Sequence, residues 1–161
     1  MRVWRFTHKR FVATAFSGED GRLFSGRWHT KGTPLAYASE HAALCVLEAL
    51  VHANLPELRD FRLVCATIPD ALIDEGPTSD ELPAGWDAPT APRTTRAVGD
   101  DWLARPNRGV ALRVPSALVP GHNVLLDPIH KQWHKVAHDD TVRAVRTAAR
   151  QSTDNPSPTR P

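Results

Sequence analysis

The longest apolar run in the sequence extends over Ala42–Val51 and is interrupted by a single charged residue, Glu48. Its apolar side chains recur three and seven positions apart, which predicts one amphipathic helix. We expect this helix to cover Ser39–Asn54, with the Ser39 hydroxyl as its N-terminal cap and Pro56 preventing further extension. Because about 20 apolar residues are needed to cross a bilayer, the run predicts a core helix and no membrane span.

The rest of the pattern predicts short strands separated by turns. Apolar or alternating runs bounded by glycine and proline are typical of strands. Such runs occur at Val3–Phe6, Leu35–Ala38, Phe61–Ile68, Gly109–Val114 and Asn123–Leu126. We expect further helices over Thr95–Ala104 and Asp139–Gln151, and irregular loops over Ser17–Gly26 and Gly76–Arg93. Because strands outnumber helices, we predict an α+β fold with a compact mixed β-sheet core and a few helices.

Length, charge and cysteine content limit the range of functions. The 161 residues fit one domain, and the proline-rich segment 152–161 is expected to be a disordered tail. The net charge is +2 and the basic residues form no dense run, so we expect no direct contact with nucleic acid. Cys45 and Cys65 both lie in apolar stretches, which predicts buried free thiols. Since no signal peptide is recognisable, we expect a cytoplasmic protein.

Glu48 is the first candidate for chemistry, because a carboxylate within an apolar helix requires an explanation. Its neighbours one helical turn away are Leu44, Cys45, Val51 and His52. In one interpretation Glu48 lies at the edge of the apolar stripe and pairs with His52 or with an arginine. In the other it lies within the stripe and must have polar partners, because an unpaired buried charge is costly.

Three further residues have side chains suited to binding a ligand. Arg27, next to Gly26, offers a rigid fork for a phosphate group, but a surface arginine beside a core tryptophan, Trp28, fits the pattern equally well. Tyr37 lies between two alanines, so its ring either faces a ligand or lies in the core. Ser116 closes a predicted strand, and no Gly-x-Ser-x-Gly elbow surrounds it, so we do not expect a hydrolase nucleophile.

The sequence contains no established motif for a metal or a nucleotide. His130, His134 and His138 have the spacing of one helix face, but Pro128 precedes them and no carboxylate has the matching offset. A Walker A loop and a Gly-x-Gly-x-x-Gly loop are also absent. We therefore expect neither a metal ion nor a bound cofactor.

Several short blocks, taken in order, resemble one known family, the RES domain. The blocks are Phe16–Glu19, Arg22–Trp28, Gly32–Tyr37, Ser39–His52, Leu82–Asp87, Gly99–Leu103 and Leu112–Pro120. Their order and spacing together are specific, and the similarity extends over roughly residues 3–131. We expect a RES domain over residues 1–138, followed by the predicted C-terminal helix at 139–151.

The family is named after an arginine, a glutamate and a serine, which correspond here to Arg27, Glu48 and Ser116. The resemblance implies a fold similar to the ADP-ribosyltransferase toxins. It also implies an enzyme that consumes NAD by cleaving the bond between nicotinamide and ribose. NAD would be the substrate of this reaction, and no separate cofactor is implied.

The resemblance also implies roles for individual residues. Arg27 would clamp the pyrophosphate, and Tyr37 would stack on the nicotinamide ring. Ser116 would hydrogen-bond the nicotinamide end of NAD. Glu48 would hold the ribose hydroxyls and stabilise the positive charge that develops as the glycosidic bond breaks. Weaker candidates for the same pocket are Arg22, Trp28 and Asn123.

Partners and the acceptor of ADP-ribose follow from the resemblance alone. Family members are toxins neutralised by an Xre-type antitoxin, which implies that partner and an oligomeric complex. The acceptor is water or phosphate in one alternative. In another it is a host protein, such as the nucleotide-synthesis enzyme phosphoribosyl pyrophosphate synthetase. In a third, the chain is a non-catalytic partner of the antitoxin. One departure is the block Asp127–Lys131, where the family often has Asn-Pro-x-His-Pro.

Overall fold

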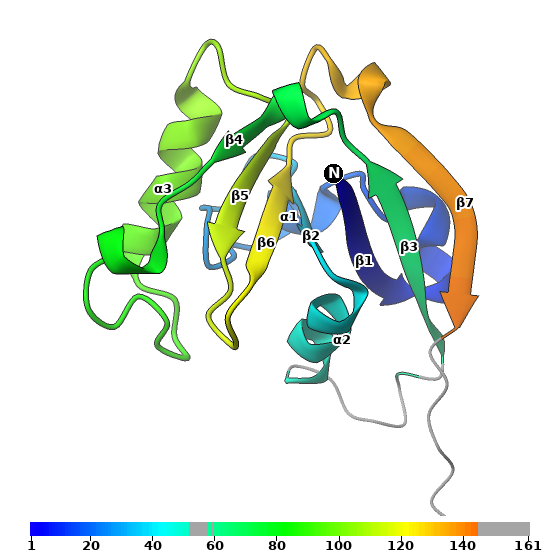
Figure 1. Cartoon of the computed structure of the whole chain (residues 1–161), viewed down its shortest axis with the longest axis horizontal. Coiled ribbons are helices and arrows are strands. Elements are labelled where there is room, and N and C mark those ends of the chain that lie inside the picture. The colour runs from blue at the N-terminus through cyan, green and yellow to red at the C-terminus, as the bar shows by residue number, and fades with distance from the viewer. Residues whose placement is uncertain (52–57, 59, 145–161) are drawn as a thin grey trace, which may run out of the picture.

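The computed structural model describes residues 1–51, 58 and 60–144, which form one twisted sheet with helices around it (Figure 1). The sheet has seven strands in the order β4-β5-β6-β2-β1-β3-β7. These are β1 (Arg2–His8), β2 (Ala36–Ser39), β3 (Phe61–Thr67), β4 (Ile73–Glu75), β5 (Ala111–Pro115), β6 (His122–Leu126) and β7 (Ala137–Ala144). Neighbouring strands are antiparallel except β4 and β5, which are parallel. The predicted α+β class with a mixed sheet is confirmed.

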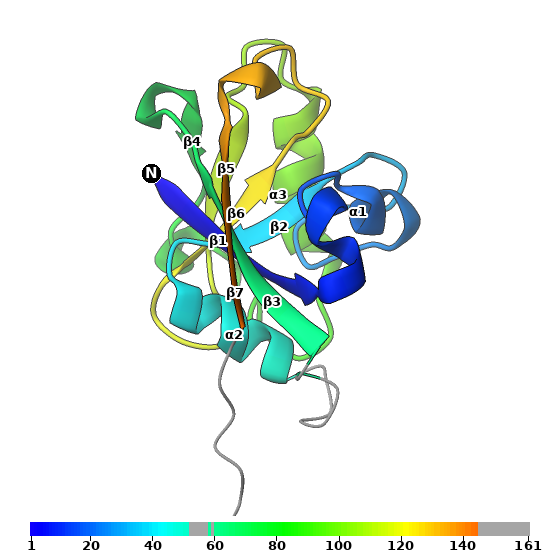
Figure 2. The same cartoon turned by 90° about the vertical axis from the view of Figure 1, so that its right-hand side faces the viewer.

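Three α-helices and four 3₁₀ turns connect the described strands. The helices are α1 (Glu19–Leu23), α2 (Ala42–Leu50) and α3 (Arg93–Ala104). The turns are η1 (Lys9–Thr14), η3 (Asp70–Leu72), η4 (Ser79–Glu81) and η5 (Trp133–Lys135). Helix α2 packs against β1 and β2, whereas α1 contacts β2 at a separate place (Figure 2). No helix in the described residues is long and apolar enough to cross a membrane.

Apolar side chains from the strands and α3 form the core. The largest buried side chains are Trp28 and Trp102, and the Trp102 indole Nε1 donates a 2.8 Å hydrogen bond to Asp74 Oδ2. Around them pack Leu35, Leu112, Val114 and Leu125. Helix α3 lies very close to the Trp28 backbone at Gly99. A Cβ atom at this position would stand only 1.8 Å from the Trp28 carbonyl oxygen.

The sheet opens between β1 and β2, and this opening positions the candidate site. Strand β1 pairs with β3 along its whole length, from Arg2↔Thr67 to His8↔Phe61. In contrast, β1 pairs with β2 only at Trp4↔Ser39. Beyond this pair the two strands diverge, and a side chain connects them instead: Arg5 Nη1 donates a 2.9 Å hydrogen bond to the Tyr37 carbonyl oxygen.

The helix around Glu48 is confirmed, but its predicted start is wrong. Ser39 is the last residue of β2, and α2 begins only at Ala42 after His41 as N-cap. The Ser39 hydroxyl donates to Asn123 Oδ1 at 2.7 Å, so it is occupied by the neighbouring strand and cannot cap the helix. Sheet pairing with β6 therefore overrides the local capping signal.

The predicted helix from Asp139 is also wrong over the described residues. Residues Ala137–Ala144 form β7, which pairs with β3 along the edge of the sheet. An Arg2–Asp139 ion pair of 2.9 Å joins β7 to β1 across β3. The open edge of β3 thus stabilises a strand where local periodicity favours a helix. The rest of that helix and the tail at 152–161 lie outside the described residues.

The five predicted strands and the helix at Thr95–Ala104 are all present, with small shifts in their bounds. Besides β7 and the 3₁₀ turns, two elements were not expected. Helix α1 interrupts the loop predicted over Ser17–Gly26, and β4 precedes the long loop that begins at Gly76. Both elements are five residues or fewer, too short for a periodic pattern.

Candidate active site

A cavity of about 210 Å³ opens where β1 and β2 diverge above α2. Its walls come from β1, β2, α2 and β6, of which only β2 and α2 are adjacent in the sequence. It is lined by Arg5, Phe6, Tyr37, Ala38, Ser39, Cys45, Glu48, Ala49 and Asn123. Three of the residues that the sequence singled out, Tyr37, Glu48 and Asn123, therefore line one cavity.

Glu48 is anchored through one carboxylate oxygen. Its Oε1 accepts a 2.8 Å hydrogen bond from the Ser116 hydroxyl and a 2.7 Å hydrogen bond from Asn123 Nδ2. No described residue hydrogen-bonds to the other oxygen, Oε2. A carboxylate that is half-buried, oriented by two donors and open on one oxygen is suited to face a developing positive charge. The described partners of Glu48 are thus a serine and an asparagine and not an arginine, whereas His52 lies outside the described residues.

Two further hydrogen bonds fix the donors of Glu48. Asn123 Oδ1 accepts from Ser39 Oγ at 2.7 Å, which orients the amide so that its nitrogen faces Glu48. The Ser116 oxygen accepts from the Leu118 backbone N–H at 3.1 Å, which leaves the hydroxyl proton for Glu48. We call Ser39, Glu48, Ser116 and Asn123 the carboxylate group. Ser39 and Ser116 are buried, so water has little access to these bonds.

Tyr37 lines the cavity but its hydroxyl points elsewhere. His29 Nε2 lies 2.8 Å from the Gly21 carbonyl, which only accepts, so Nε2 is the donor and Nδ1 of a neutral ring is the acceptor. The Tyr37 hydroxyl therefore donates to Nδ1 at 2.8 Å, and it accepts from the Trp28 N–H at 3.2 Å. Burial raises the pKa of the Tyr37 hydroxyl well above its ordinary value, so it stays protonated.

Arg27 does not line the cavity. Its guanidinium donates to two backbone carbonyls of the segment between β4 and α3, to Trp86 at 2.7 Å and to Ala88 at 2.8 Å. Trp86 in turn packs against Trp28 with ring centroids 5.8 Å apart. Arg27 thus ties the long loop to the core. We call Arg27, Trp28, His29 and Tyr37 the anchoring group.

Two weaker candidates also lie away from the cavity. Trp28 is 1% exposed and belongs to the core. Arg22 is on the exposed side of α1, where it forms an ion pair with Glu19. The geometry therefore separates Asn123, which contacts Glu48, from Trp28 and Arg22, which do not.

Two ionisable residues that line the cavity were not singled out as site candidates from the sequence. Arg5 lies in the middle of β1, and nothing in its local pattern distinguishes it from any strand arginine. Cys45 precedes Glu48 by three positions, so helical spacing indicated their proximity. Burial raises the pKa of the Cys45 thiol to about 12, so it is not a nucleophile at neutral pH. Both cysteines are buried and free, as predicted.

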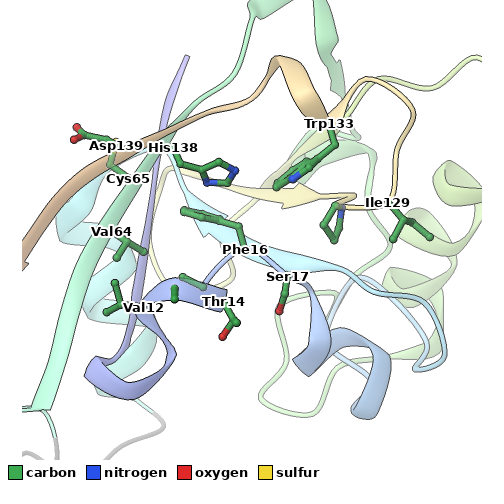
Figure 3. A pocket seen from close by; sticks show the side chains of 13 residues that line it. Val12, Thr14, Phe16, Ser17, Val64, Cys65, Ile129, Trp133, His138 and Asp139 are labelled. Atoms are coloured by element: carbon green, nitrogen blue, oxygen red, sulfur yellow. The ribbon is translucent and has the colours of Figure 1, made fainter.

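A second cavity, of about 540 Å³, lies beside β3 and β7 (Figure 3). The rings of Phe16 and Trp133 point into it, and His138 stands between them with centroids 5.5 Å and 5.6 Å away. Neither the carboxylate group nor the anchoring group contributes to this cavity. The carboxylate of Glu48 and the side chains that orient it are therefore absent from this cavity.

The histidines do not form a metal site in the described residues. His130 is buried after β6, His134 lies in η5 and His138 belongs to β7, so the three do not share a helix face. No cluster of three or more potential ligands is present among the described side chains.

The chain resembles known proteins in both fold and sequence. Its fold matches the toxin–antitoxin complex MbcT–MbcA of M. tuberculosis with a TM-score of 0.72 and 18% identity, covering 89% of this chain and 83% of that one. The profile of the RES domain family matches residues 2–147. The chain belongs to the RES domain family.

Named relatives support this assignment. A protein named "Toxin Res" from Photorhabdus laumondii is 39% identical over 137 residues, which is 84% of this chain and 86% of the relative. A protein named "Prs ADP-ribosylating toxin" from Sphingobium sp. is 36% identical over 133 residues, which is 79% of this chain and 82% of the relative.

Proposed function

We propose that this protein is the toxin of a toxin–antitoxin pair and that it consumes NAD by cleaving the bond between nicotinamide and ribose. The observation that carries the proposal is Glu48, held by Ser116 and Asn123 at the cavity between β1 and β2, with one oxygen open. The names of the relatives support a toxin, and one of those names includes ADP-ribosylation.

The reaction needs little acid–base chemistry from the chain. The bond between C1′ of the ribose and the nicotinamide nitrogen breaks, and the electron pair leaves with a neutral nicotinamide. Positive charge then develops on the ribose, and the Glu48 carboxylate stabilises it. The acceptor attacks C1′ and loses its proton. Ser116 and Asn123 act as positioning residues, because their hydrogen bonds orient the carboxylate before the reaction.

Tyr37 and Arg27 contribute differently in this proposal. The Tyr37 ring belongs to the cavity wall and is available to stack on nicotinamide, while its hydroxyl is held by His29. Arg27 keeps the segment of Trp86 and Ala88 in place and supports the site from outside the cavity. These bonds use two of the five guanidinium N–H groups, so only the remaining ones would be available to a pyrophosphate.

The acceptor of ADP-ribose defines two versions of the proposal. Water or phosphate would make the protein a glycohydrolase or phosphorylase. A protein side chain would make it a mono-ADP-ribosyltransferase, and the relative named "Prs ADP-ribosylating toxin" supports this version and a nucleotide-synthesis enzyme as target. The exposed loop around Pro83–Gly85 is a suitable surface for recognising a protein.

We further propose an Xre-type antitoxin as the partner. The support is that a structure with the same fold is a toxin–antitoxin complex. Such a pair would act on NAD in the cytoplasm, without a metal ion, a bound cofactor or direct contact with nucleic acid.

The test is incubation of the purified protein with NAD, with and without phosphate, followed by chromatography of nicotinamide and the ribosyl product. Glu48→Gln should lower nicotinamide release by roughly 10²- to 10³-fold, as loss of electrostatic stabilisation of a transition state does. The matched control is Glu81→Gln, an exposed glutamate of η4 away from the cavity, which should leave the rate unchanged.

The product decides between the versions. Free ADP-ribose indicates water, a phosphorylated product indicates phosphate, and label transferred from NAD to a protein in a cell extract indicates a transferase. No nicotinamide release and no labelled protein from the folded wild type would contradict the proposal and favour a non-catalytic partner of an antitoxin.

A further inference from the structure

Arg5 occupies the junction of three cavities. It lines the 210 Å³ cavity of Glu48, a cavity of about 520 Å³ beside Phe61, and a cavity of about 290 Å³ beside α1. The first two cavities share Phe6, and the last two share Asp20 as well as Arg5. The three cavities therefore adjoin one another at the Arg5 side chain, and we call them together the cleft.

The Arg5 guanidinium is only partly committed to the fold. Nη1 donates to the Tyr37 carbonyl at 2.9 Å, and Nη2 pairs with Asp20 Oδ2 at 2.6 Å. The third nitrogen, Nε, is buried and has no hydrogen-bond partner in the described part of the chain. A buried donor without a partner is uncommon and marks a place where a ligand or solvent is expected.

The two members of the Arg5–Asp20 pair differ in exposure. The Arg5 side chain is 17% exposed, whereas that of Asp20 is 77% exposed. Such a carboxylate is held loosely, because an exposed partner loses little when it returns to water. Asp20 thus places a replaceable negative charge beside a fixed, largely buried cation.

We propose that Asp20 is an internal stand-in for the diphosphate of the substrate, and that substrate binding exchanges Asp20 for that diphosphate on Arg5. This inference rests on the proposed function and names the residues that take the non-reacting half of the substrate. An arginine fork fits phosphate oxygens as well as it fits a carboxylate, so the exchange preserves the geometry of the site.

The dimensions of the cleft support this assignment. A cavity of 210 Å³ is smaller than the roughly 300–1,000 Å³ typical of a ligand site, and it accommodates only the reacting end of a dinucleotide. On the other side of Arg5, the 520 Å³ cavity is lined by His8, Phe11 and Phe61. The Phe11 ring is 49% exposed, and the Arg10 guanidinium lies 4.6 Å from its centroid, so the ring and the cation together offer a surface to a purine.

The test is binding of ADP-ribose and of adenosine to the full chain, measured by calorimetry. Asp20→Asn keeps the size of the side chain and removes its charge. It should tighten ADP-ribose binding about threefold to fivefold, the range that loss of a competing exposed ion pair implies. Adenosine, which has no phosphate, should bind both proteins equally.

The matched control is Asp80→Asn, an exposed aspartate of η4 with the same change in net charge. It should bind ADP-ribose like the wild type. In an Arg5→Gln background, whose fold is checked by circular dichroism, the effect of Asp20→Asn should disappear, because the two residues act on one site.

The outcomes distinguish this inference from the proposed function. Tighter ADP-ribose binding by Asp20→Asn supports it even if NAD is never cleaved. Unchanged or weaker binding overturns it even if Glu48 proves essential. Equal tightening by Asp80→Asn, or of adenosine, would show a general charge effect and overturn it. Absence of measurable ADP-ribose binding by both wild type and Asp20→Asn at millimolar concentration would also overturn it.

Discussion

The carboxylate group and the anchoring group lie close together but are built differently. In the carboxylate group, Glu48 has one oxygen held by two donors and the other without a partner in the described residues. In the anchoring group, the Tyr37 hydroxyl, both nitrogens of His29 and both terminal nitrogens of Arg27 are bonded within the protein.

This difference distinguishes side chains that are available to a ligand from side chains that stabilise the fold. A polar group with spare bonding capacity is available to a ligand, whereas one whose bonds are all internal stabilises the fold. Three of the residues that the family resemblance marks as functional are therefore divided between two tasks. Glu48 and Ser116 serve the first task, and Arg27 serves the second through the two N–H groups that it donates to the Trp86 and Ala88 carbonyls.

The largest expected effect is loss of stability on removing a large side chain from the anchoring group. Trp28→Ala should lower the free energy of unfolding by about 3–5 kcal/mol, because the 1% exposed ring leaves a cavity between Leu35 and Trp102. Chemical denaturation measures this. Trp4→Ala, a half-buried tryptophan of β1, is the control and should lose less. An equal loss in both variants would contradict the central packing role of Trp28.

The next effect should appear mainly in catalysis. Asn123→Ala removes the donor to Glu48 Oε1, and a hydrogen bond to a charged group is worth about 1.5–3 kcal/mol. We expect kcat for NAD cleavage to fall roughly 10- to 100-fold with little change in KM. Because the buried Ser39 hydroxyl also loses its acceptor, the free energy of unfolding should fall by about 1–3 kcal/mol. The exposed Asn107→Ala should behave like the wild type. A rise in KM at constant kcat would instead assign Asn123 to substrate binding.

Tyr37→Phe separates the ring from the hydroxyl within one residue. The variant leaves His29 Nδ1 and the Trp28 N–H without their partner, which should cost about 1–3 kcal/mol of unfolding free energy. Because the ring remains, kcat should change less than twofold to threefold, as roughly expected when no transition-state contact is lost. A large loss of kcat with unchanged stability would place the hydroxyl in the reaction and break the comparison.

The smallest effect concerns a charge cluster that supports the β5–β6 hairpin. Burial of Glu40 opposes its ionisation, but hydrogen bonds from His122 and Arg113 outweigh burial and lower the pKa of Glu40 below its ordinary value. Because the pKa of Glu40 is lower in the folded than in the unfolded protein, its ionisation stabilises the fold at pH values above the unfolded-state pKa, near 4.5. This stabilisation is lost as the pH falls through the lower pKa of the folded state. Denaturation of wild type and Glu40→Gln should therefore differ less at acidic than at neutral pH, whereas a constant difference would contradict the linkage.

The sequence alone predicted most of the sheet, because short apolar runs between prolines and glycines allow few alternatives. It failed where long-range pairing outweighs local pattern. Segment Ala137–Ala144 is a strand because β3 offers it an edge, and Ser39 belongs to β2 because it pairs with Asn123 of β6. Both pairing partners are distant in the sequence, so local patterns and propensities could not predict either pairing.

The candidate site was predicted in part for a similar reason. Glu48 was conspicuous because a carboxylate among apolar side chains violates a local pattern. Arg5 was not, since an arginine in a strand violates nothing until the neighbouring strand diverges from it. The direction of the Arg27 fork, toward Trp86 and Ala88, likewise depends on how the long loop returns to the core.

The close approach of α3 to the Trp28 backbone has a consequence for sequence variation. Because a methyl group at position 99 would overlap the Trp28 carbonyl oxygen, every residue except glycine forces the helix outward. Position 99 thus accommodates only glycine, although it lies in a helix, where glycine is otherwise among the least favourable residues. Among natural variants of this chain, a change at Gly99 should therefore arise only together with compensating changes elsewhere along the contact between α3 and the Trp28 segment.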